Sequence, residues 1–286
     1  KAPNSRPRRR PRRRPKPRRE AVGASPPHGM MQLTTIGTGT ISLTPGRGCA
    51  AHLVEAGDVR LLMDCGPGTA TSLARLDIDW WSLTHVAFTH FHLDHIADFP
   101  ALVFAWRHAR VAPREAPLVL LGLPGTIALV ERWAAALGAW LATPGFPLVV
   151  QEVALETPVA LGDDVTLEAR AVPHTEESVA YSVTHAGRRL VYTGDTGEDA
   201  TLGAWAAGCD LLLAECSLPA SMAIPSHLTP AQCGALAAAA NPRRLVLTHM
   251  YPPLEGADLR AEIGAHWTGA VVVATDGLRL SIEESD

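Results

Sequence analysis

Four residues able to bind metal ions lie within six consecutive positions of this chain. His90, His92, Asp94 and His95 belong to the run Thr-His-Phe-His-Leu-Asp-His, which begins at residue 89. An apolar, strand-like stretch precedes the run, so we expect a strand end and a tight loop that direct several side chains toward one point. Neutral imidazole and carboxylate are ligands that zinc and similar cations take. The spacing predicts a metal site, and a chance histidine cluster on a solvated loop is the alternative.

Further ligands are needed if the site holds more than one ion, and three candidates follow apolar segments. His174, Asp195 and His249 come after the strand-like residues 165–172, 190–193 and 245–248, respectively. A single His or Asp after a strand is more often a cap or a turn residue. Three of them in this order, after a His-x-His-x-Asp-His run, favour one shared site.

The order of these residues resembles the metallo-β-lactamase superfamily of dinuclear metallohydrolases, over about residues 31 to 280. The triplet Asp64-Cys-Gly66 matches that family's first Asp-x-Gly motif. The resemblance implies seven metal ligands in two sets with one bridge: His90, His92 and His174 for one ion, Asp94, His95 and His249 for the other, and Asp195 between them. It also implies that Asp64 is a structural residue that braces the metal loop.

Two divalent cations about 3.5–4 Å apart lower the pKa of a bridging water, so that a hydroxide nucleophile is available near neutral pH. They also polarise the oxygen under attack. The resemblance therefore implies a dinuclear metal-dependent hydrolase in which Asp94 helps to orient or deprotonate the water. Two Zn²⁺ ions are the expected cofactors, and Mn²⁺ or iron suit the same ligands.

Glu215 and His227 resemble the Glu and His that the ribonuclease Z branch and its phosphodiesterase relatives place between the bridging Asp and the last His ligand. A histidine oriented by a carboxylate can donate to a phosphoryl oxygen or protonate a leaving alkoxide, which suits phosphoester cleavage. The resemblance thus implies catalytic roles for both residues. A solvent-facing carboxylate and a histidine at a helix entry are the alternatives.

One departure from the ribonuclease Z pattern concerns the segment before Asp195. That family inserts a long Gly/Pro-rich arm there to grip tRNA, whereas this chain has only 20 residues, 175–194, in which we expect a plain hairpin. We therefore predict a phosphodiesterase that acts on a small-molecule substrate, with ribonuclease Z-type RNA cleavage disfavoured. Hydrolysis of a carboxylic ester, lactone or β-lactam at the same metals is the main alternative, but it gives Glu215 and His227 no task.

The N-terminal residues differ in charge from the rest of the chain. Residues 1–20 hold 11 of the 25 Lys and Arg residues and one of the 29 acidic residues, which leaves 14 basic and 28 acidic residues and a net charge of −14 in the remainder. This net negative charge on the remainder of the chain repels polyphosphate backbones at long range. We expect residues 1–29 to be a disordered Arg/Pro-rich tail ahead of a natural start at Met30 or Met31. A nucleic-acid arm, and with it a non-catalytic RNA-binding protein, is the less favoured interpretation.

Residues 30–286 are long enough for one hydrolase domain with a substantial core. No apolar run approaches the length of a membrane span, so no membrane partner is expected. The five cysteines are scattered and odd in number, which is typical of buried thiols in a cytoplasmic protein. A homodimer is expected only through the family resemblance.

Hydrophobic periodicity and turn residues predict the secondary structure. Strands are expected near 32–37, 50–55, 59–64, 85–89, 118–121, 148–153, 165–172, 179–184, 189–193, 211–214, 245–248, 271–274 and 278–282. Helices are expected near 68–75, 97–110, 125–139, 199–206, 230–240 and 257–265, with Thr229 capping the helix at 230. This pattern and the resemblance predict an α/β protein, a four-layer αβ/βα sandwich with its site on one edge.

The segments 96–117 and 122–147 are expected to wall the substrate pocket. They are rich in aromatic residues, namely Phe99, Phe104, Trp106, Trp133, Trp140 and Phe146. An apolar wall would suit a small organic phosphodiester better than long RNA. Ordinary helix packing is the alternative interpretation of these rings.

Overall fold

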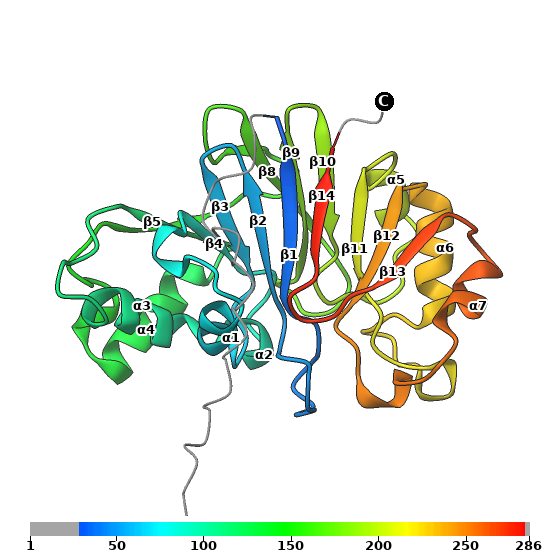
Figure 1. Ribbon diagram of the computed structural model, residues 1–286, viewed down its shortest axis with the longest axis horizontal. Coiled ribbons are helices and arrows are strands. Elements are labelled where there is room, and N and C mark those ends of the chain that lie inside the picture. The colour runs from blue at the N-terminus through cyan, green and yellow to red at the C-terminus, as the bar shows by residue number, and fades with distance from the viewer. Residues whose placement is uncertain (1–28, 284–286) are drawn as a thin grey trace, which may run out of the picture.

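The computed structural model describes residues 29–283, which form two seven-stranded mixed sheets packed face to face (Figure 1). The first sheet contains β1 (Met31–Gly37), β2 (Ala51–Ala56), β3 (Val59–Met63), β4 (His85–Ala87), β5 (Leu118–Gly122), β6 (Leu148–Glu152) and β14 (Arg279–Ile282). Its spatial order is β14-β1-β2-β3-β4-β5-β6. The expected tail, residues 1–29, lies outside the described residues except for Gly29 and stays a prediction.

The second sheet is built from the other strands in the order β13-β12-β11-β10-β9-β8-β7. These strands are β7 (Val159–Ala160), β8 (Val165–Ala171), β9 (Val179–His185), β10 (Arg188–Tyr192), β11 (Leu211–Glu215), β12 (Arg244–Thr248) and β13 (Ala270–Val273). β9 and β10 pair antiparallel as the plain hairpin expected between His174 and Asp195. β7, which has two residues, was not predicted because so short a strand has no periodicity.

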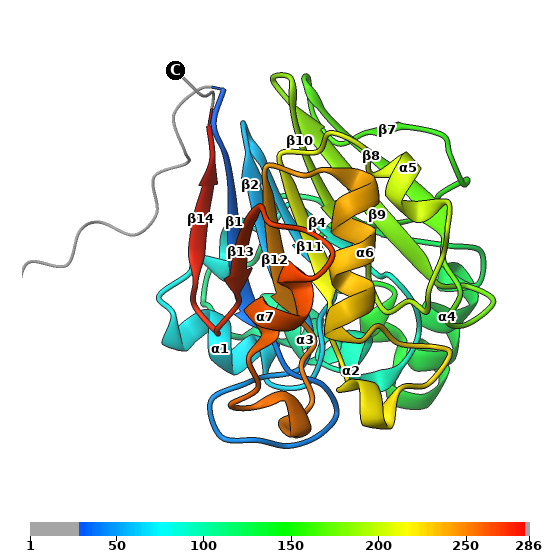
Figure 2. The same ribbon diagram turned by 90° about the vertical axis from the view of Figure 1, so that its right-hand side faces the viewer.

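Helices cover the outer face of each sheet and complete four layers. The helices α1 (Thr69–Arg75), α2 (Leu93–Ile96), α3 (Phe99–His108) and α4 (Thr126–Leu137) lie on the side of the first sheet. The helices α5 (Leu202–Trp205), α6 (Pro230–Ala240) and α7 (Leu259–Gly264) lie on the side of the second sheet, where Figure 2 shows α6 and α7 in front of the strands. The predicted αβ/βα sandwich is confirmed. In residues 29–283 no helix is both long and apolar enough to cross a membrane.

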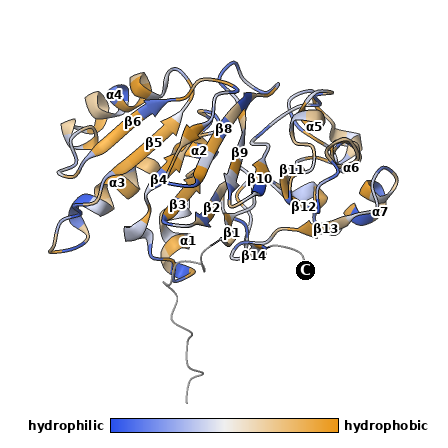
Figure 3. Cartoon of the chain, turned by 90° about the horizontal axis from the view of Figure 1, so that it is seen from above, coloured by the Kyte–Doolittle hydropathy of each residue, from blue (hydrophilic) through white to orange (hydrophobic). Residues whose placement is uncertain are grey.

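The strands are apolar on both faces because both faces are buried. In β3, Leu61 and Met63 join the core between the sheets, whereas Leu62 packs toward the helices. The strand β11 repeats the pattern with Leu213 inside and Leu212 against the helical layer. Burial on both faces explains the near-continuous hydrophobic runs of the sequence, and the strands are predominantly hydrophobic in Figure 3.

Parallel pairing brings the functional loops to one edge. β3, β4, β5 and β6 run parallel, as do β10, β11, β12 and β13. Their carboxyl ends therefore share an edge, the lower one in Figure 1, where α2 lies. Ligands of open α/β sheets bind outside the carboxyl ends of the strands. This edge carries the candidate residues.

The helix α6 begins as predicted. The Thr229 hydroxyl accepts from the Gln232 backbone N–H, Gln232 caps the Thr229 backbone in return, and Pro230 occupies the first helical position. The helix expected near 97–110 is confirmed as α3, whereas the short helix α2 directly before it was not predicted. All five cysteines are buried free thiols, as expected.

Candidate metal centre

Loops at the carboxyl ends of the strands supply the candidate ligands. His90 and His92 follow β4, and Asp195 and His249 follow β10 and β12. The expectation of a tight loop over the whole His-x-His-x-Asp-His run is wrong at its end, because residues 93–96 form the helix α2. One helical turn places Asp94 and His95 inward, and both are buried.

Three histidines form the first group of converging side chains. His90, His92 and His174 each offer a ring nitrogen, and these atoms lie within 4.8 Å of one another. The Nε2 atom of His174 is 3.0 Å from Nδ1 of His92. Nδ1 of His174 is 2.8 Å from the carbonyl oxygen of Ser226, to which it donates when it carries the proton. That bond fixes the tautomer and leaves Nε2 free to act as a ligand.

Asp94, His95 and His249 form the second group, again with one ligand atom each within 4.8 Å. Nε2 of His249 is 3.5 Å from Oδ2 of Asp94 and 3.3 Å from Nε2 of His95. The backbone N–H of Ile41 donates to the same Asp94 oxygen over 3.1 Å, so the loop after β1 holds this carboxylate in place.

Asp195 lies between the two groups. Its Oδ2 atom is 3.9 Å from Nε2 of His90 and 3.8 Å from Nε2 of His174. Its Oδ1 atom is 3.3 Å from Nε2 of His95 and 3.4 Å from Nε2 of His249. Each carboxylate oxygen thus faces a different group, which is the arrangement that a bridging ligand requires.

Two buried atoms of this cluster have no hydrogen-bond partner. They are Nε2 of His90 and Oδ1 of Asp195, and both point into the space where the ligand atoms converge. Buried polar atoms are nearly always satisfied, so each exception needs an explanation. A bound cation would satisfy both, and imidazole with carboxylate is a donor set that divalent metals accept. The residues therefore fit a metal centre.

The charges of the site also favour a cation. Burial lowers the pKa of His90 and of His174, which keeps these rings neutral, and metal ligation needs neutral rings. Burial opposes charge on His95 too, but the carboxylates of Asp195 and Asp64 outweigh it and raise its pKa. The neighbouring histidines hold the pKa of Asp195 well below its usual range despite its burial. The pocket thus combines the neutral rings of His90 and His174 with an ionised carboxylate that attracts positive charge.

Asp64 braces the metal loop, as the resemblance implies. Its Oδ1 atom accepts from the Thr89 backbone N–H over 2.8 Å, and its Oδ2 atom lies 2.8 Å from Nδ1 of His95. The hydroxyl of Tyr192 donates to the same Oδ2 over 3.0 Å. Asp64 has a φ of 59° and His249 a φ of 54°. Non-glycine residues are uncommon at positive φ, in the left-handed region, and residues with this backbone conformation are often found at functional sites.

Gly66 allows the helix α2 to approach this brace, because a Cβ at position 66 would lie 1.9 Å from the carbonyl oxygen of Asp94. Gly66→Ala is therefore expected to lower the free energy of unfolding by about 3 kcal/mol or to displace α2, because overpacking against backbone has no easy relief. Denaturant unfolding measures the change. Gly264→Ala is the matched control because a Cβ there meets nothing within 4 Å; equal stability of the two variants would contradict the explanation.

Glu215 and His227 lie together beside the ligand cluster. Nδ1 of His227 is 2.9 Å from Oε1 of Glu215, which is fully buried. The same oxygen accepts from the Thr196 backbone N–H over 2.8 Å. Burial lowers the pKa of His227, but the hydrogen bond and charge of Glu215 outweigh it and the pKa rises. Because Nδ1 is hydrogen-bonded to Glu215, Nε2 of His227 is free to contact a bound molecule. His227 lies near His174 and Asp195.

Ser217 is a site residue that the sequence reasoning missed. Its hydroxyl contacts Oε2 of Glu215 and lies 3.0 Å from Nδ1 of His249. Donation to Glu215 leaves the oxygen to accept from His249, which turns Nε2 of His249 toward Asp94 and Asp195. The sequence signal that could have identified Ser217 was its position two residues after Glu215, because residues two apart in an extended chain lie on the same side.

Ser217→Ala is expected to lower turnover and metal affinity about 10–100-fold, the usual cost of losing a group that orients a ligand. Turnover and competition with a chelator measure the two effects. Ser182→Ala is the matched control, because Ser182 is also buried but bonds Arg189. Unchanged chelator sensitivity in Ser217→Ala would contradict the role given to this hydroxyl.

The expected aromatic wall is wrong for most of its members. Phe99, Trp106 and Phe146 are buried in the core between the first sheet and its helices, and Trp133 and Trp140 pack against that core. Of the expected segments, only residues 123 and 124 line the groove of about 520 Å³ beside the metal loops. The helices α3 and α4 use their rings to attach to the sheet, because large aromatic surfaces contribute most to such packing.

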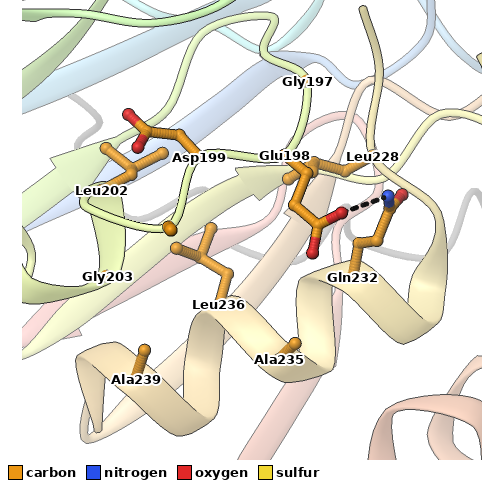
Figure 4. A pocket seen from close by; sticks show the side chains of 11 residues that line it. Gly197, Glu198, Asp199, Leu202, Gly203, Leu228, Gln232, Ala235, Leu236 and Ala239 are labelled. Atoms are coloured by element: carbon orange, nitrogen blue, oxygen red, sulfur yellow. Dashed lines mark hydrogen bonds between the residues drawn. The ribbon is translucent and has the colours of Figure 1, made fainter. Parts of the chain in front are cut away.

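A smaller cavity of about 100 Å³ lies between the loop that follows Asp195 and the helix α6 (Figure 4). Glu198 and Gln232 line it and are joined by a hydrogen bond of 3.3 Å, in which the Gln232 amide donates, and Leu228 and Leu236 line it as well. The candidate ligands do not line this cavity.

Comparison with known proteins agrees with this fold. The family model for the beta-lactamase superfamily domain matches residues 59–250. A protein named Ribonuclease Z from Mycobacterium bovis (strain BCG / Pasteur 1173P2) is 29% identical over 279 residues, covering 88% of this chain and 99% of that protein. The uncharacterized protein Rv1339 of Mycobacterium tuberculosis (strain H37Rv) is 31% identical over 245 residues, covering 84% of this chain and 88% of that protein.

Solved structures share the fold. The metallo-β-lactamase fold protein YhfI from Bacillus subtilis superposes with a TM-score of 0.76 at 23% identity, over 88% of this chain and 99% of that chain. The short form of human tRNase Z (ELAC1) gives a TM-score of 0.72 at 23% identity, over 88% of this chain and 100% of that chain. The chain belongs to the metallo-β-lactamase superfamily of metal-dependent hydrolases.

Proposed function

We propose that this protein is a phosphodiesterase that uses two divalent cations, with zinc as the expected metal. His90, His92 and His174 would hold one cation, and Asp94, His95 and His249 would hold the other. The observation that carries the proposal is Asp195, whose two oxygens face the two groups separately. When bound, such a pair supplies a hydroxide nucleophile near neutral pH and polarises the oxygen under attack.

The residues of the chain have separate tasks in the proposed reaction. Asp94, whose Oδ2 is held by the backbone of Ile41, orients the attacking water and takes up its proton. His227 donates a proton from Nε2 to a phosphoryl oxygen or to the leaving alkoxide. Glu215 holds Nδ1 of His227 and stabilises the charged ring. This pair has no task in lactone or β-lactam hydrolysis, so its position beside the ligands favours a phosphodiester.

A substrate smaller than tRNA is favoured by the short hairpin and by charge. Residues 175–194 contain the whole of β9 and β10, with no room for a tRNA-gripping arm. The chain beyond residue 20 carries a net charge of −14, which repels an RNA backbone. RNA cleavage is kept as the second candidate because the relative from Mycobacterium bovis is named Ribonuclease Z.

A side-by-side activity panel tests the proposal. The metal-loaded protein is offered a bis-aryl phosphate, a cyclic nucleotide, a precursor tRNA, a lactone and a β-lactam. We expect turnover of at least one small phosphodiester with kcat/KM well above those of the lactone and the β-lactam. Selective turnover of the tRNA would favour the second candidate. Turnover confined to the lactone or the β-lactam would overturn both.

A further inference from the structure

A groove of about 520 Å³ lies directly beside the first group of candidate ligands. Phe91, one of its lining residues, stands between His90 and His92 in the chain. Glu176 and Glu177, which follow His174 by two and three residues, also line it. The two loops that carry the first ligand group therefore both contribute to the lining of the groove.

The interior of the groove is apolar. Besides Phe91, it is lined by Leu123, Val153 and Leu155, which follow the strands β5 and β6. Phe91 is half-buried and Leu155 is 44% exposed, so apolar surface is available to a bound molecule. A volume of this size accommodates a ring or a short aliphatic chain, since small-molecule pockets span about 300–1,000 Å³.

The charge at the groove is negative. Glu176 and Glu177 are its charged lining residues, and its lining contains no Lys or Arg. A second phosphate or a carboxylate placed here would meet two like charges, and no Lys or Arg of the lining would compensate them. An apolar group, or one with N–H donors at its edge, meets no such penalty, because carboxylates accept hydrogen bonds.

We infer that this groove binds the non-reacting substituent of the substrate, and that this substituent is apolar and without negative charge. The inference rests on the proposed phosphodiesterase function and names its substrate class: a compact diester with a single phosphate and an organic group that fills the groove. Phe91 and Leu155 supply the apolar contact, and Glu176 and Glu177 exclude polyphosphates.

A series of p-nitrophenyl phosphodiesters with one leaving group tests the inference. The other substituent is methyl, phenyl or 4-carboxyphenyl, so that differences in kcat/KM report the substituent. We expect phenyl to exceed methyl by about tenfold or more, in line with the 10–200-fold range of apolar pocket contacts. We expect 4-carboxyphenyl to fall below phenyl by a similar factor.

Two variants locate the effect in the groove. Leu155→Ala is expected to reduce the phenyl-to-methyl ratio several-fold, whereas Leu137→Ala, an exposed leucine on α4 that does not line the groove, leaves it unchanged. Glu176→Lys, at an exposed position, is expected to raise several-fold the ratio of kcat/KM for the 4-carboxyphenyl ester to kcat/KM for the phenyl ester. Metal content and thermal unfolding of each variant establish that the site and the fold are intact.

The possible failures differ from one another. Equal kcat/KM for phenyl and methyl esters in the unmodified protein would overturn the inference and leave the proposed function standing. A phenyl preference that Leu155→Ala does not alter would place the substituent elsewhere and would also overturn it. Absence of turnover with every diester would overturn the proposed function, and the inference with it.

Discussion

Asp195→Asn is expected to lower phosphodiester turnover at least about 100-fold, because losing even an indirect partner of a metal ligand costs about 10–100-fold. The variant keeps the volume of the side chain and removes its charge. Oδ1 and Oδ2 face separate ligand groups over 3.3–3.9 Å, so one change affects both candidate metal positions. Kinetic measurement of kcat, together with the metal content per chain, reports the loss.

The control for this variant is Asp58→Asn, an exposed aspartate in the turn between β2 and β3. It removes the same charge at the opposite end of the strands from the site. We expect it to retain full activity and the full complement of metal. If Asp195→Asn kept both its metal and its turnover, Asp195 would not be the bridge.

His227→Ala is expected to lower phosphodiester turnover by about 10²–10⁴-fold, the range for loss of a positioned proton donor. Hydrolysis of an activated carboxylic ester at the same centre should fall far less, because its leaving group departs without this proton. Metal content should stay near that of the unmodified protein, because His227 is not one of the proposed metal ligands and its Nδ1 atom bonds Glu215. The measurement is kcat for a diester and an ester on the same preparation.

His266→Ala serves as the control, since His266 is an exposed histidine outside the ligand cluster. Equal proportional losses on diester and ester in His227→Ala would remove the case for phosphodiester specificity. The Glu215→Gln variant is expected to reproduce the loss in part, because the amide still accepts a hydrogen bond from Nδ1 but no longer stabilises a charged ring.

Local patterns were enough to predict most of the architecture. Strands buried on both faces, such as β11 and β12, give continuous apolar runs, and the Thr-Pro pair at 229 and 230 marks the start of α6. The short helix α2 escaped prediction because its four residues are too few for a helical period. Its conformation depends on Gly66, which is 28 residues from Asp94 in sequence and admits the Asp94 carbonyl oxygen at close range.

The candidate ligands could be named from sequence because each follows a strand and carries a metal-binding side chain. Their convergence into two groups around Asp195 depends on pairing between strands that are distant in the sequence. Before the structure, only the family resemblance indicated that these residues share one site. The aromatic rings of α3 and α4 were misplaced because composition cannot distinguish a ring that faces a sheet from one that faces a ligand. Phe91, the aromatic residue that does line the groove, lay unnoticed inside the histidine run.

Metal stoichiometry tests the central claim most directly. The protein is saturated with Zn²⁺, freed of loosely bound ions, and analysed by mass spectrometry of its metals alongside Asp195→Asn. The account predicts close to two ions per chain in the unmodified protein, as a two-metal hydrolase requires, and fewer in the variant. Saturation at one ion or none in the unmodified protein would contradict it.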